Sequence, residues 1–355
     1  MTDIKSLSKT ELREFLVANG HPKYRADQLY DWMHVKLAKS FDEMNNIPKN
    51  LREFLKENTF YAGFDVLACL KSAKGDTKKY LFGLKDGNAI ESVWMKYKHG
   101  NSVCISSQVG CRMGCKFCAS TIGGLVRNLT PAEMLEQVYA ITRETGERVS
   151  NVVIMGSGEP FDNFDTVVKF IRMVSDEDGL NISQRNITVS TCGLVPGILK
   201  FAEEDLNVTL AISLHAYNDE KRKEIMPVAN KYKIKEIIDA CKVYFEKTGR
   251  RISYEYSLIK GVNDSEEDAA GLASVLRNCY AHVNLIPVNP IKERDFKRSE
   301  VTNVLQFQQM LEKKGINVTI RREMGADINA ACGQLRRSYE KTMKGDKADE
   351  GLCGN

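Results

Sequence analysis

The chain has 355 residues, of which 43% are hydrophobic and 28% charged, and 51 Lys+Arg against 47 Asp+Glu give a formal net charge of only +4. This composition is typical of a soluble globular protein, and no run of about 18 apolar residues is present that could cross a membrane. The small net charge does not by itself indicate a nucleic-acid partner, and ten cysteines are too few for a disulfide-stapled secreted domain.

Residues 1–60 predict a small helical accessory domain, because apolar residues such as Leu12, Phe15 and Leu16 recur at helical spacing. Ser8 is a candidate N-cap, and Glu11 completes a capping box with it. The first residues lack the apolar core of a signal peptide, so we expect the mature chain to begin here and to be cytoplasmic. A monomer is the default expectation.

Residues 61–98 alternate between apolar and polar residues, with a hairpin turn signal at Asp86–Gly87. We therefore expect a short β-meander linker between the helical domain and the rest of the chain. The basic residues between Lys71 and Lys79, like Arg321–Arg322 and the 292–298 segment, either contact phosphates or are simply solvated.

From residue 99 to 343 the chain alternates strand-like and helix-like segments, which predicts a parallel sheet covered by helices. The clearest helix spans 130–146, with Thr130 as N-cap, Glu133 completing a capping box and Gly146 at the end. Strands are expected near 102–107, 152–156, 186–191, 208–214, 252–258, 282–287 and 316–321. Six or seven such units are fewer than a closed barrel needs, so the expected fold is α/β, a partial (β/α)6 barrel. Residues 344–355 look like a polar tail.

In such a barrel, functional residues gather at the carboxyl ends of the strands. The candidates at these positions are Cys111–Cys118, Gly156–Pro160, Ser190–Cys192, Ser213–His215 and Asn289. Taken singly, each is a common loop or capping residue, and only their shared position indicates a site.

Cys111, Cys115 and Cys118 stand at C-x3-C-x2-C spacing directly behind the apolar strand that contains Cys104. Three thiolates on one loop can each bind one iron of a 4Fe-4S cluster and leave the fourth iron for S-adenosylmethionine (SAM). A structural zinc site is the alternative, but it needs four ligands, and only Cys104 is available as the fourth.

These residues resemble the radical-SAM superfamily, and the resemblance narrows to the RlmN/Cfr family of RNA methyltransferases. It rests on CISSQVGC, MGSGEP at 155–160, SLHA at 213–216, NLIPVNP at 284–290 and AACGQL at 330–335. The GEP and IPVNP motifs are more similar to those of the RlmN branch, which methylates adenine C2 of 23S rRNA and tRNA, than to those of the Cfr branch, which methylates C8. Ser157 and Cys192 differ from the residues usual at these positions in RlmN sequences.

The resemblance implies roles for individual residues. Gly158 and Glu159 would lie against the SAM amino group, and the rest of the SAM pocket would be formed by Ser190, Ser213, Leu214, His215 and Asn289. Cys332 would carry a methyl group, and a radical formed from a second SAM would activate that group for addition to C2. Glu91 would accept the C2 proton, and Cys104 would release the RNA by forming a disulfide with Cys332. Read without the resemblance, Cys104 is a core residue and Glu91 a solvated carboxylate.

The resemblance also implies 23S rRNA and tRNA as substrates and a reducing electron donor such as flavodoxin or ferredoxin. Two alternatives remain open at this point: C8 methylation, and a non-catalytic RNA-binding protein with a structural metal.

Overall fold

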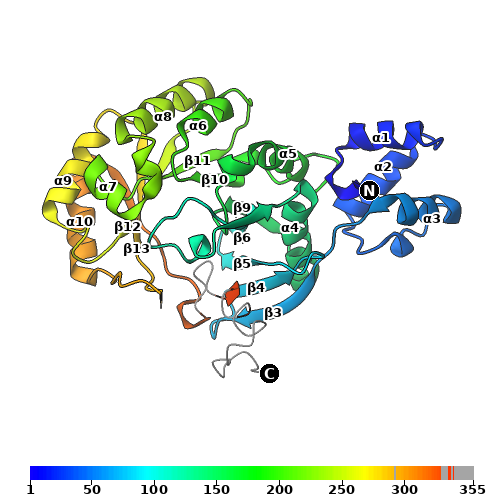
Figure 1. Ribbon diagram of the computed structural model, residues 1–355, viewed down its shortest axis with the longest axis horizontal. Coiled ribbons are helices and arrows are strands. Elements are labelled where there is room, and N and C mark those ends of the chain that lie inside the picture. Colours follow the sequence, from blue (N-terminus) through cyan, green and yellow to red (C-terminus); the bar gives the residue numbers. More distant parts are fainter. Residues whose placement is uncertain (292, 329–334, 337–338, 340–355) are drawn as a thin grey trace.

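The protein is described by a computed structural model in which residues 1–291, 293–328, 335–336 and 339 are placed. A ten-stranded sheet forms its centre, in the order β14-β13-β12-β11-β10-β9-β6-β5-β4-β3 (Figure 1). The described end strands β3 and β14 are not paired with each other, so the sheet is open.

Seven strands of this sheet run parallel to one another, as the strand and helix alternation predicts. They are β6 (Gly100–Ile105), β9 (Val149–Ile154), β10 (Ile187–Thr191), β11 (Thr209–Ser213), β12 (Ile252–Leu258), β13 (Ala281–Pro287) and β14 (Asn317–Ile320). The expected α/β sheet and helical N-terminal domain are confirmed.

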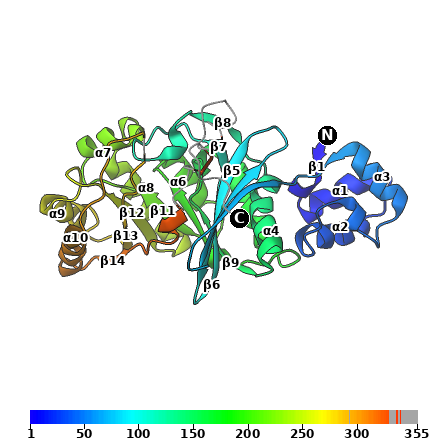
Figure 2. The ribbon, with the colours of Figure 1, turned by 90° about the horizontal axis from the view of Figure 1, so that it is seen from below.

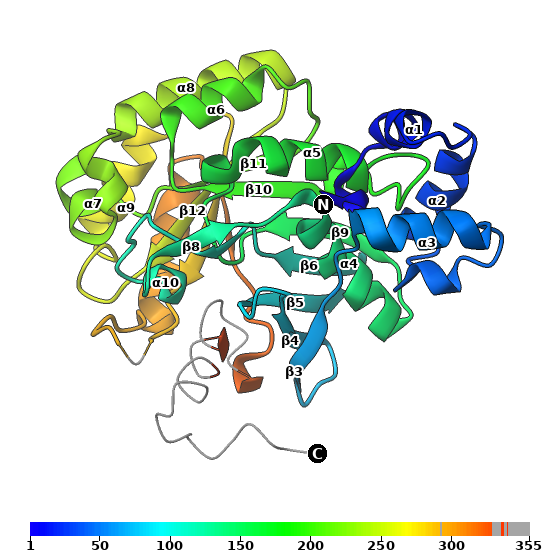
Figure 3. The same cartoon turned by 45° about the vertical axis from the view of Figure 1, so that its right-hand side comes forward.

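Helices cover the outer face of the sheet (Figures 1 and 3). They are α4 (Pro131–Thr145), α5 (Phe164–Val174), α6 (Val195–Ala202), α7 (Asp219–Ile225), α8 (Ile234–Thr248), α9 (Glu266–Val275) and α10 (Val301–Lys313). α4 begins and ends as its sequence predicts. Thr130 Oγ1 accepts the backbone N–H of Glu133 at 3.2 Å, and Gly146 takes a left-handed conformation with φ 67°.

Strands β3 (Asp65–Lys71), β4 (Thr77–Gly83) and β5 (Ala89–Tyr97) pair antiparallel and continue the same sheet beyond β6. Asp86–Gly87 form the turn between β4 and β5, with Gly87 at φ 81°. Segment 61–98, which the sequence suggested as a linker, therefore contributes three strands to the central sheet.

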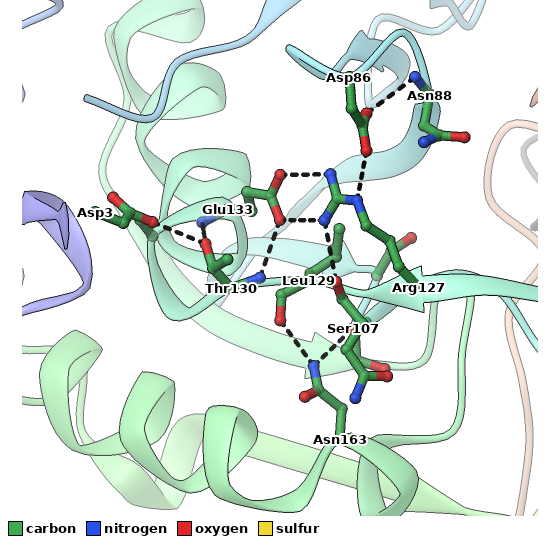
Figure 4. A network of polar contacts seen from close by, with 12 residues as sticks. Asp3, Asp86, Asn88, Ser107, Arg127, Leu129, Thr130, Glu133 and Asn163 are labelled. Atoms are coloured by element: carbon green, nitrogen blue, oxygen red, sulfur yellow. Dashed lines mark hydrogen bonds and ion pairs between the residues drawn. The ribbon is translucent and has the colours of Figure 1, made fainter. Parts of the chain in front are cut away.

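The N-terminal helices α1 (Lys9–Ala18), α2 (Arg25–His34) and α3 (Lys49–Asn58) lie at the end of the molecule opposite α9 and α10 (Figure 2). A buried ion pair joins them to the core, because Lys5 Nζ lies 2.7 Å from Glu136 Oε2 on α4. Asp3 also accepts a hydrogen bond from the Thr130 hydroxyl (Figure 4).

A short antiparallel ribbon closes the base of the cysteine loop, and sequence analysis did not anticipate it. It pairs β7 (Gln108–Gly110) with β8 (Leu125–Asn128), and the Cys111 N–H donates to Gly124 O at 3.0 Å. Gly110 has φ +79°, and a Cβ there would lie 2.1 Å from Gly124 O. Only glycine fits at this position, so the two ends of the loop can meet.

Candidate active site

One cavity of about 340 Å3 lies at the carboxyl ends of the parallel strands. It is large enough for a small-molecule ligand. Most residues selected from the sequence line it: Cys104, Cys111, Cys115, Cys118, Gly158, Glu159, Ser190, Ser213, His215 and Asn289. Residues from five separate segments therefore converge on one site, as expected for a barrel of this type.

Leu214 does not line the cavity, although it lies between two residues that do. Its side chain is fully buried in the main core, and its carbonyl accepts a hydrogen bond from Arg222. Any contact of Leu214 with a ligand in the cavity would therefore come from its backbone.

The three loop cysteines face this cavity, and two of them, Cys111 and Cys115, are only 6% and 8% exposed. Burial raises the pKa of the Cys111 thiol to about 12, and it also raises that of Cys115, with the neighbouring thiols adding to both shifts. Such a loop holds neutral thiols until a cation arrives to displace their protons.

Within the described part of the chain, no group of three His, Cys, Asp or Glu side chains is arranged to hold a metal ion. The four cysteines Cys104, Cys111, Cys115 and Cys118 nevertheless line the same space. A 4Fe-4S cluster binds its thiolates at separate corners of a cube, so it does not require them to meet at one point. The donor set therefore fits such a cluster better than the four-ligand zinc site.

Gly158 allows two loops to approach closely beside the cavity. Its φ is +114°, and a Cβ on it would lie 2.7 Å from both Ser107 Oγ and Gln108 Cβ. A larger residue would push the loop after β9 away from the loop after β6, so glycine is required here for packing.

Glu159 ties the end of β9 to the end of β10. Its two carboxylate oxygens accept the backbone N–H groups of Phe161 at 3.0 Å and Cys192 at 2.8 Å. The Glu159 N–H in turn donates to Gln108 Oε1 at 2.9 Å. Burial raises the pKa of this carboxyl, while the backbone N–H of Cys192 opposes that rise. The Glu159 side chain therefore lines the cavity and also holds the segments after β9 and β10 together.

His215 occupies a strained position with φ 59°. The Ser257 N–H donates to its Nδ1 at 2.9 Å, and its ring packs edge-on against Phe117 of the cysteine loop. Burial lowers the pKa of His215 to about 3, with the charge of Arg222 as a second cause. The imidazole is therefore neutral, with its proton on Nε2 as a donor for a ligand.

The opposite side of the cavity is lined by Val93 and Met95 of β5 and by Cys104 of β6. Lys79, the sheet partner of Val93, and Glu91 lie on the same face of β4 and β5, and we call these five residues the antiparallel wall. Cys104 and Val93 are direct partners in the sheet, and both pack with Met95. Glu91 and Val93 are two residues apart on β5, so their side chains lie on the same face of the sheet.

Glu91 is buried, with 5% of its surface exposed, and so is not the solvated carboxylate of the alternative interpretation. Its Oε2 lies 3.0 Å from the Nζ of Lys79, which is fully buried. Lys79 therefore does not belong to a solvated basic stretch. The other oxygen of Glu91 accepts the backbone N–H of Arg336 at 2.5 Å.

Cys332 lies outside the described residues, as does the 344–355 tail. Its described neighbours in the sequence contact the antiparallel wall: Leu335 packs with Leu81 and Ala89, and Arg336 bonds to Glu91. Earlier in the same C-terminal segment, Met324 packs against the group formed by Val93, Met95 and Cys104.

Sequence reasoning missed the role of Gln108, which bridges several loops. Besides accepting from Glu159, its amide donates to Asn128 at 2.8 Å and to Asp162 at 3.0 Å. The one signal in the sequence for this role is the position of Gln108, three residues before Cys111. Arg298, Arg321 and Arg322 also line the cavity, and Arg298 forms an ion pair with Glu323 at 2.8 Å. Contact of these basic residues with phosphate stays a prediction.

In the part of the chain that the structure describes, no helix has the length and apolar character needed to span a membrane.

Two family models match the chain: the radical SAM superfamily over residues 105–273 and the ribosomal RNA large subunit methyltransferase N-terminal domain over residues 2–60. Probable dual-specificity RNA methyltransferases RlmN are similar over nearly the full length. The one from Lachnospira eligens is 60% identical over 99% of this chain and 100% of its own. The one from Lachnoclostridium phytofermentans is 60% identical over 96% of both chains.

Among solved structures, a radical SAM methyltransferase from Sphaerobacter thermophilus is 44% identical. It superposes with a TM-score of 0.91 and covers 94% of this chain and 99% of its own.

Proposed function

Because this chain belongs to the RlmN family of radical-SAM RNA methyltransferases, we propose that it methylates carbon 2 of adenine in 23S rRNA, at the adenosine-2503 type of site, and in tRNA. C2 of adenine is an electron-poor carbon and does not attack a sulfonium methyl group as a nitrogen does. The reaction therefore needs a radical, and the residues of the cavity are suited to generating and using one.

Membership of this family implies a 4Fe-4S cluster and SAM. Cys111, Cys115 and Cys118 would bind the cluster, which supplies the electron that cleaves SAM to a 5′-deoxyadenosyl radical. Gly158, Glu159, Ser190, Ser213, Leu214 and Asn289 would surround SAM, and the neutral His215 would donate a hydrogen bond to it. A reduced flavodoxin or ferredoxin is the expected electron source.

In this proposal Cys332 carries the new carbon, first as an S-methyl group taken from one SAM. A hydrogen atom is then removed from that methyl group, and the carbon bonds to C2. Glu91 accepts the proton that leaves C2, and the adduct, which is a radical, returns one electron to the oxidised electron carrier. The Cys104 thiolate then attacks the Cys332 sulfur, which forms an S–S bond and breaks the S–C bond, and the carbon left on the base takes up a proton to become the methyl group. The disulfide must be reduced before the next turnover.

The observation that best supports this proposal is the shared placement of two kinds of cysteine. Cys104 lines the same cavity as the three loop cysteines, although it lies on β6, before strand β7, and they lie after β7. Glu91, on the strand next to Cys104, bonds to Arg336, four residues beyond Cys332. These contacts would bring the methyl carrier, the resolving thiol and the base to one side of the cavity.

Anaerobic turnover with methyl-labelled SAM on deproteinised 23S rRNA and on tRNA, followed by nucleoside mass spectrometry, tests the proposal. We expect 2-methyladenosine from both RNAs, from protein that carries about four irons per chain. A product with 8-methyladenosine alone would replace this proposal by C8 methylation. A colourless zinc protein that leaves SAM intact would favour a non-catalytic RNA-binding role.

A further inference from the structure

Arg222 on α7 is a fully buried arginine, and among the described residues its hydrogen-bond partners are all backbone carbonyl groups. Its Nε donates to Leu214 O at 3.0 Å, and Nη2 donates to Cys192 O at 2.7 Å and to Ser213 O at 3.1 Å. A longer bond of 3.5 Å joins Nη1 to Tyr232 O. Across the described residues, no carboxylate lies within ion-pair distance of this guanidinium group.

Such an arrangement is costly, because a buried charge without a counter-ion loses its hydration and gains no Coulomb attraction in return. Asp219, on the same helix, acts on Arg222 only from a distance, and its Oδ1 already accepts the Ile234 N–H. Carbonyl dipoles compensate part of the cost, but the positive charge remains. A folded chain that keeps this group buried is expected to place an anion near it.

Arg222 and its helix contact the end of β10 and the cysteine loop, and both of these segments carry thiols. The Lys116 N–H donates to Ile225 O at 2.9 Å, which fastens the loop to the helix that carries Arg222. Cys115 and Cys192 pack with Ile225 and Met226 in one small apolar cluster.

We propose that Arg222 is the fixed counter-charge of the iron–sulfur cluster and raises its reduction potential. This inference rests on the proposed function, because it takes Cys111, Cys115 and Cys118 as the cluster ligands. Reduction adds one negative charge to a cluster that its three thiolates already make anionic. A buried cation stabilises the reduced form more than the oxidised form, because little water screens the interaction. Arg222 is a tuning residue, since it acts through the cluster and need not touch SAM or RNA.

The test is an anaerobic redox titration of the cluster in the full-length holoprotein, followed by electron paramagnetic resonance. In Arg222→Gln we expect the ratio of reduced to oxidised cluster, at the wild-type midpoint, to fall at least about tenfold, which equals a shift of about 59 mV to more negative potential. Arg222→Lys keeps the charge and should stay within about twofold of wild type by the same conversion.

Arg250→Gln is the matched control. The Arg250 side chain also bonds to backbone and hydroxyl oxygens of the segment 208–209, but this segment begins β11, at the end away from the cavity. Its variant should not shift the potential. An unchanged midpoint in Arg222→Gln, or an equal shift in Arg222→Lys, would overturn the proposal.

If Arg222→Gln does not bind the cluster, thermal unfolding of the cluster-free proteins provides the test instead. We expect the cluster-free variant to fold as well as cluster-free wild type, because in cluster-free wild type the guanidinium group also lacks its anion. A cluster-free Arg222→Gln that fails to fold would assign Arg222 to the fold alone and overturn the proposal. A wild-type protein that binds no cluster would instead refute the proposed function itself.

Discussion

The two sides of the cavity are built on different principles. The parallel side, formed by the ends of β9 to β13 and the cysteine loop, presents groups without an ion-pair partner: protonated thiols, a neutral His215, and the Glu159 carboxyl group, which accepts two backbone N–H groups. The antiparallel wall instead holds a buried ion pair between Lys79 and Glu91 next to Cys104.

This difference suggests a division of labour. The parallel side has the donors and acceptors that a cofactor needs, and Arg222 stands behind it with a charge that only an anion would balance. The antiparallel wall has the groups that a covalent reaction on RNA needs: a thiol and a carboxylate. Changes on the parallel side should therefore abolish radical formation, whereas changes on the antiparallel wall should leave it intact.

The largest expected effect comes from Cys115→Ala on the parallel side. Loss of one cluster ligand should reduce the iron content and abolish both SAM cleavage and RNA methylation. Iron analysis and detection of 5′-deoxyadenosine measure this. Cys241→Ala is the control, because Cys241 is a buried core residue of α8 outside the cavity. Normal iron content in Cys115→Ala would remove the cysteine from the ligand set.

The next effect concerns the antiparallel wall. Glu91→Gln should slow RNA methylation by about a hundredfold to ten-thousandfold, because the amide cannot accept the C2 proton. Iron content and SAM cleavage should remain. The control is Glu144→Gln, whose carboxylate pairs with Lys78, the neighbour of Lys79 on the opposite face of β4. If both variants retain full methylation, Glu91 is not the base.

Arg127, on β8, connects the cysteine-loop side of the cavity to the antiparallel strands. Its replacement should have a smaller effect, and this effect should be on stability. Its guanidinium bonds to both oxygens of Glu133 at 2.8 Å and to Asp86, in the turn between β4 and β5, at 2.5 Å (Figure 4). Arg127→Met should reduce the free energy of unfolding by about 2 kcal/mol, since these are charged hydrogen bonds in a partly buried site. Denaturant titration measures it.

Arg172→Met is the control for that variant, because Arg172 forms an exposed surface pair with Glu204. It should cost at most about 1 kcal/mol. If both variants lose the same free energy of unfolding, then Arg127 does not join the β7–β8 ribbon to the turn between β4 and β5.

Low pH should reduce the stability of the folded protein through His215 on the parallel side of the cavity. The pKa of His215 is about 3 in the folded protein, whereas an ordinary histidine has a pKa of 6.5, so the unfolded chain binds the extra proton at intermediate pH. Stability is therefore present above pH 6.5 and decreases as the pH falls toward 3. This group should contribute a loss of about 2 kcal/mol between pH 7 and pH 5.

His215→Asn should make the pH dependence of unfolding shallower, because Asn tolerates the left-handed backbone and does not titrate. His34, whose burial also lowers its pKa to about 3, would continue to contribute in both proteins. Identical slopes for wild type and His215→Asn would show that His215 does not remain neutral in the folded protein.

The sequence predicted the elements well where local signals and packing agree. The Thr130 to Gly146 helix has both caps, and every expected strand of the parallel sheet is present. Most of the residues that the cysteine spacing and the strand ends identified line the cavity. These features depend on neighbours in sequence and on a regular fold, so they can be predicted from the sequence alone.

Features that depend on contacts between distant segments could not be predicted. Lys79 lies among basic residues in the sequence, and only the pairing of β4 with β5 shows that it is buried beside Glu91. Arg222 is one of many charged residues on a short helix, and nothing local shows that it is enclosed. Likewise, the role of segment 61–98 in the main sheet depends on the pairing of β5 with β6.

The division between the two sides is tested most directly with Cys104→Ala, incubated anaerobically with SAM, reductant and 23S rRNA. We predict normal iron content and formation of 5′-deoxyadenosine, together with RNA covalently joined to the protein and little free methylated RNA, because the thiol that releases the adduct is missing. Free methylated RNA at the wild-type rate, or loss of 5′-deoxyadenosine formation in a protein with a full cluster, would contradict it.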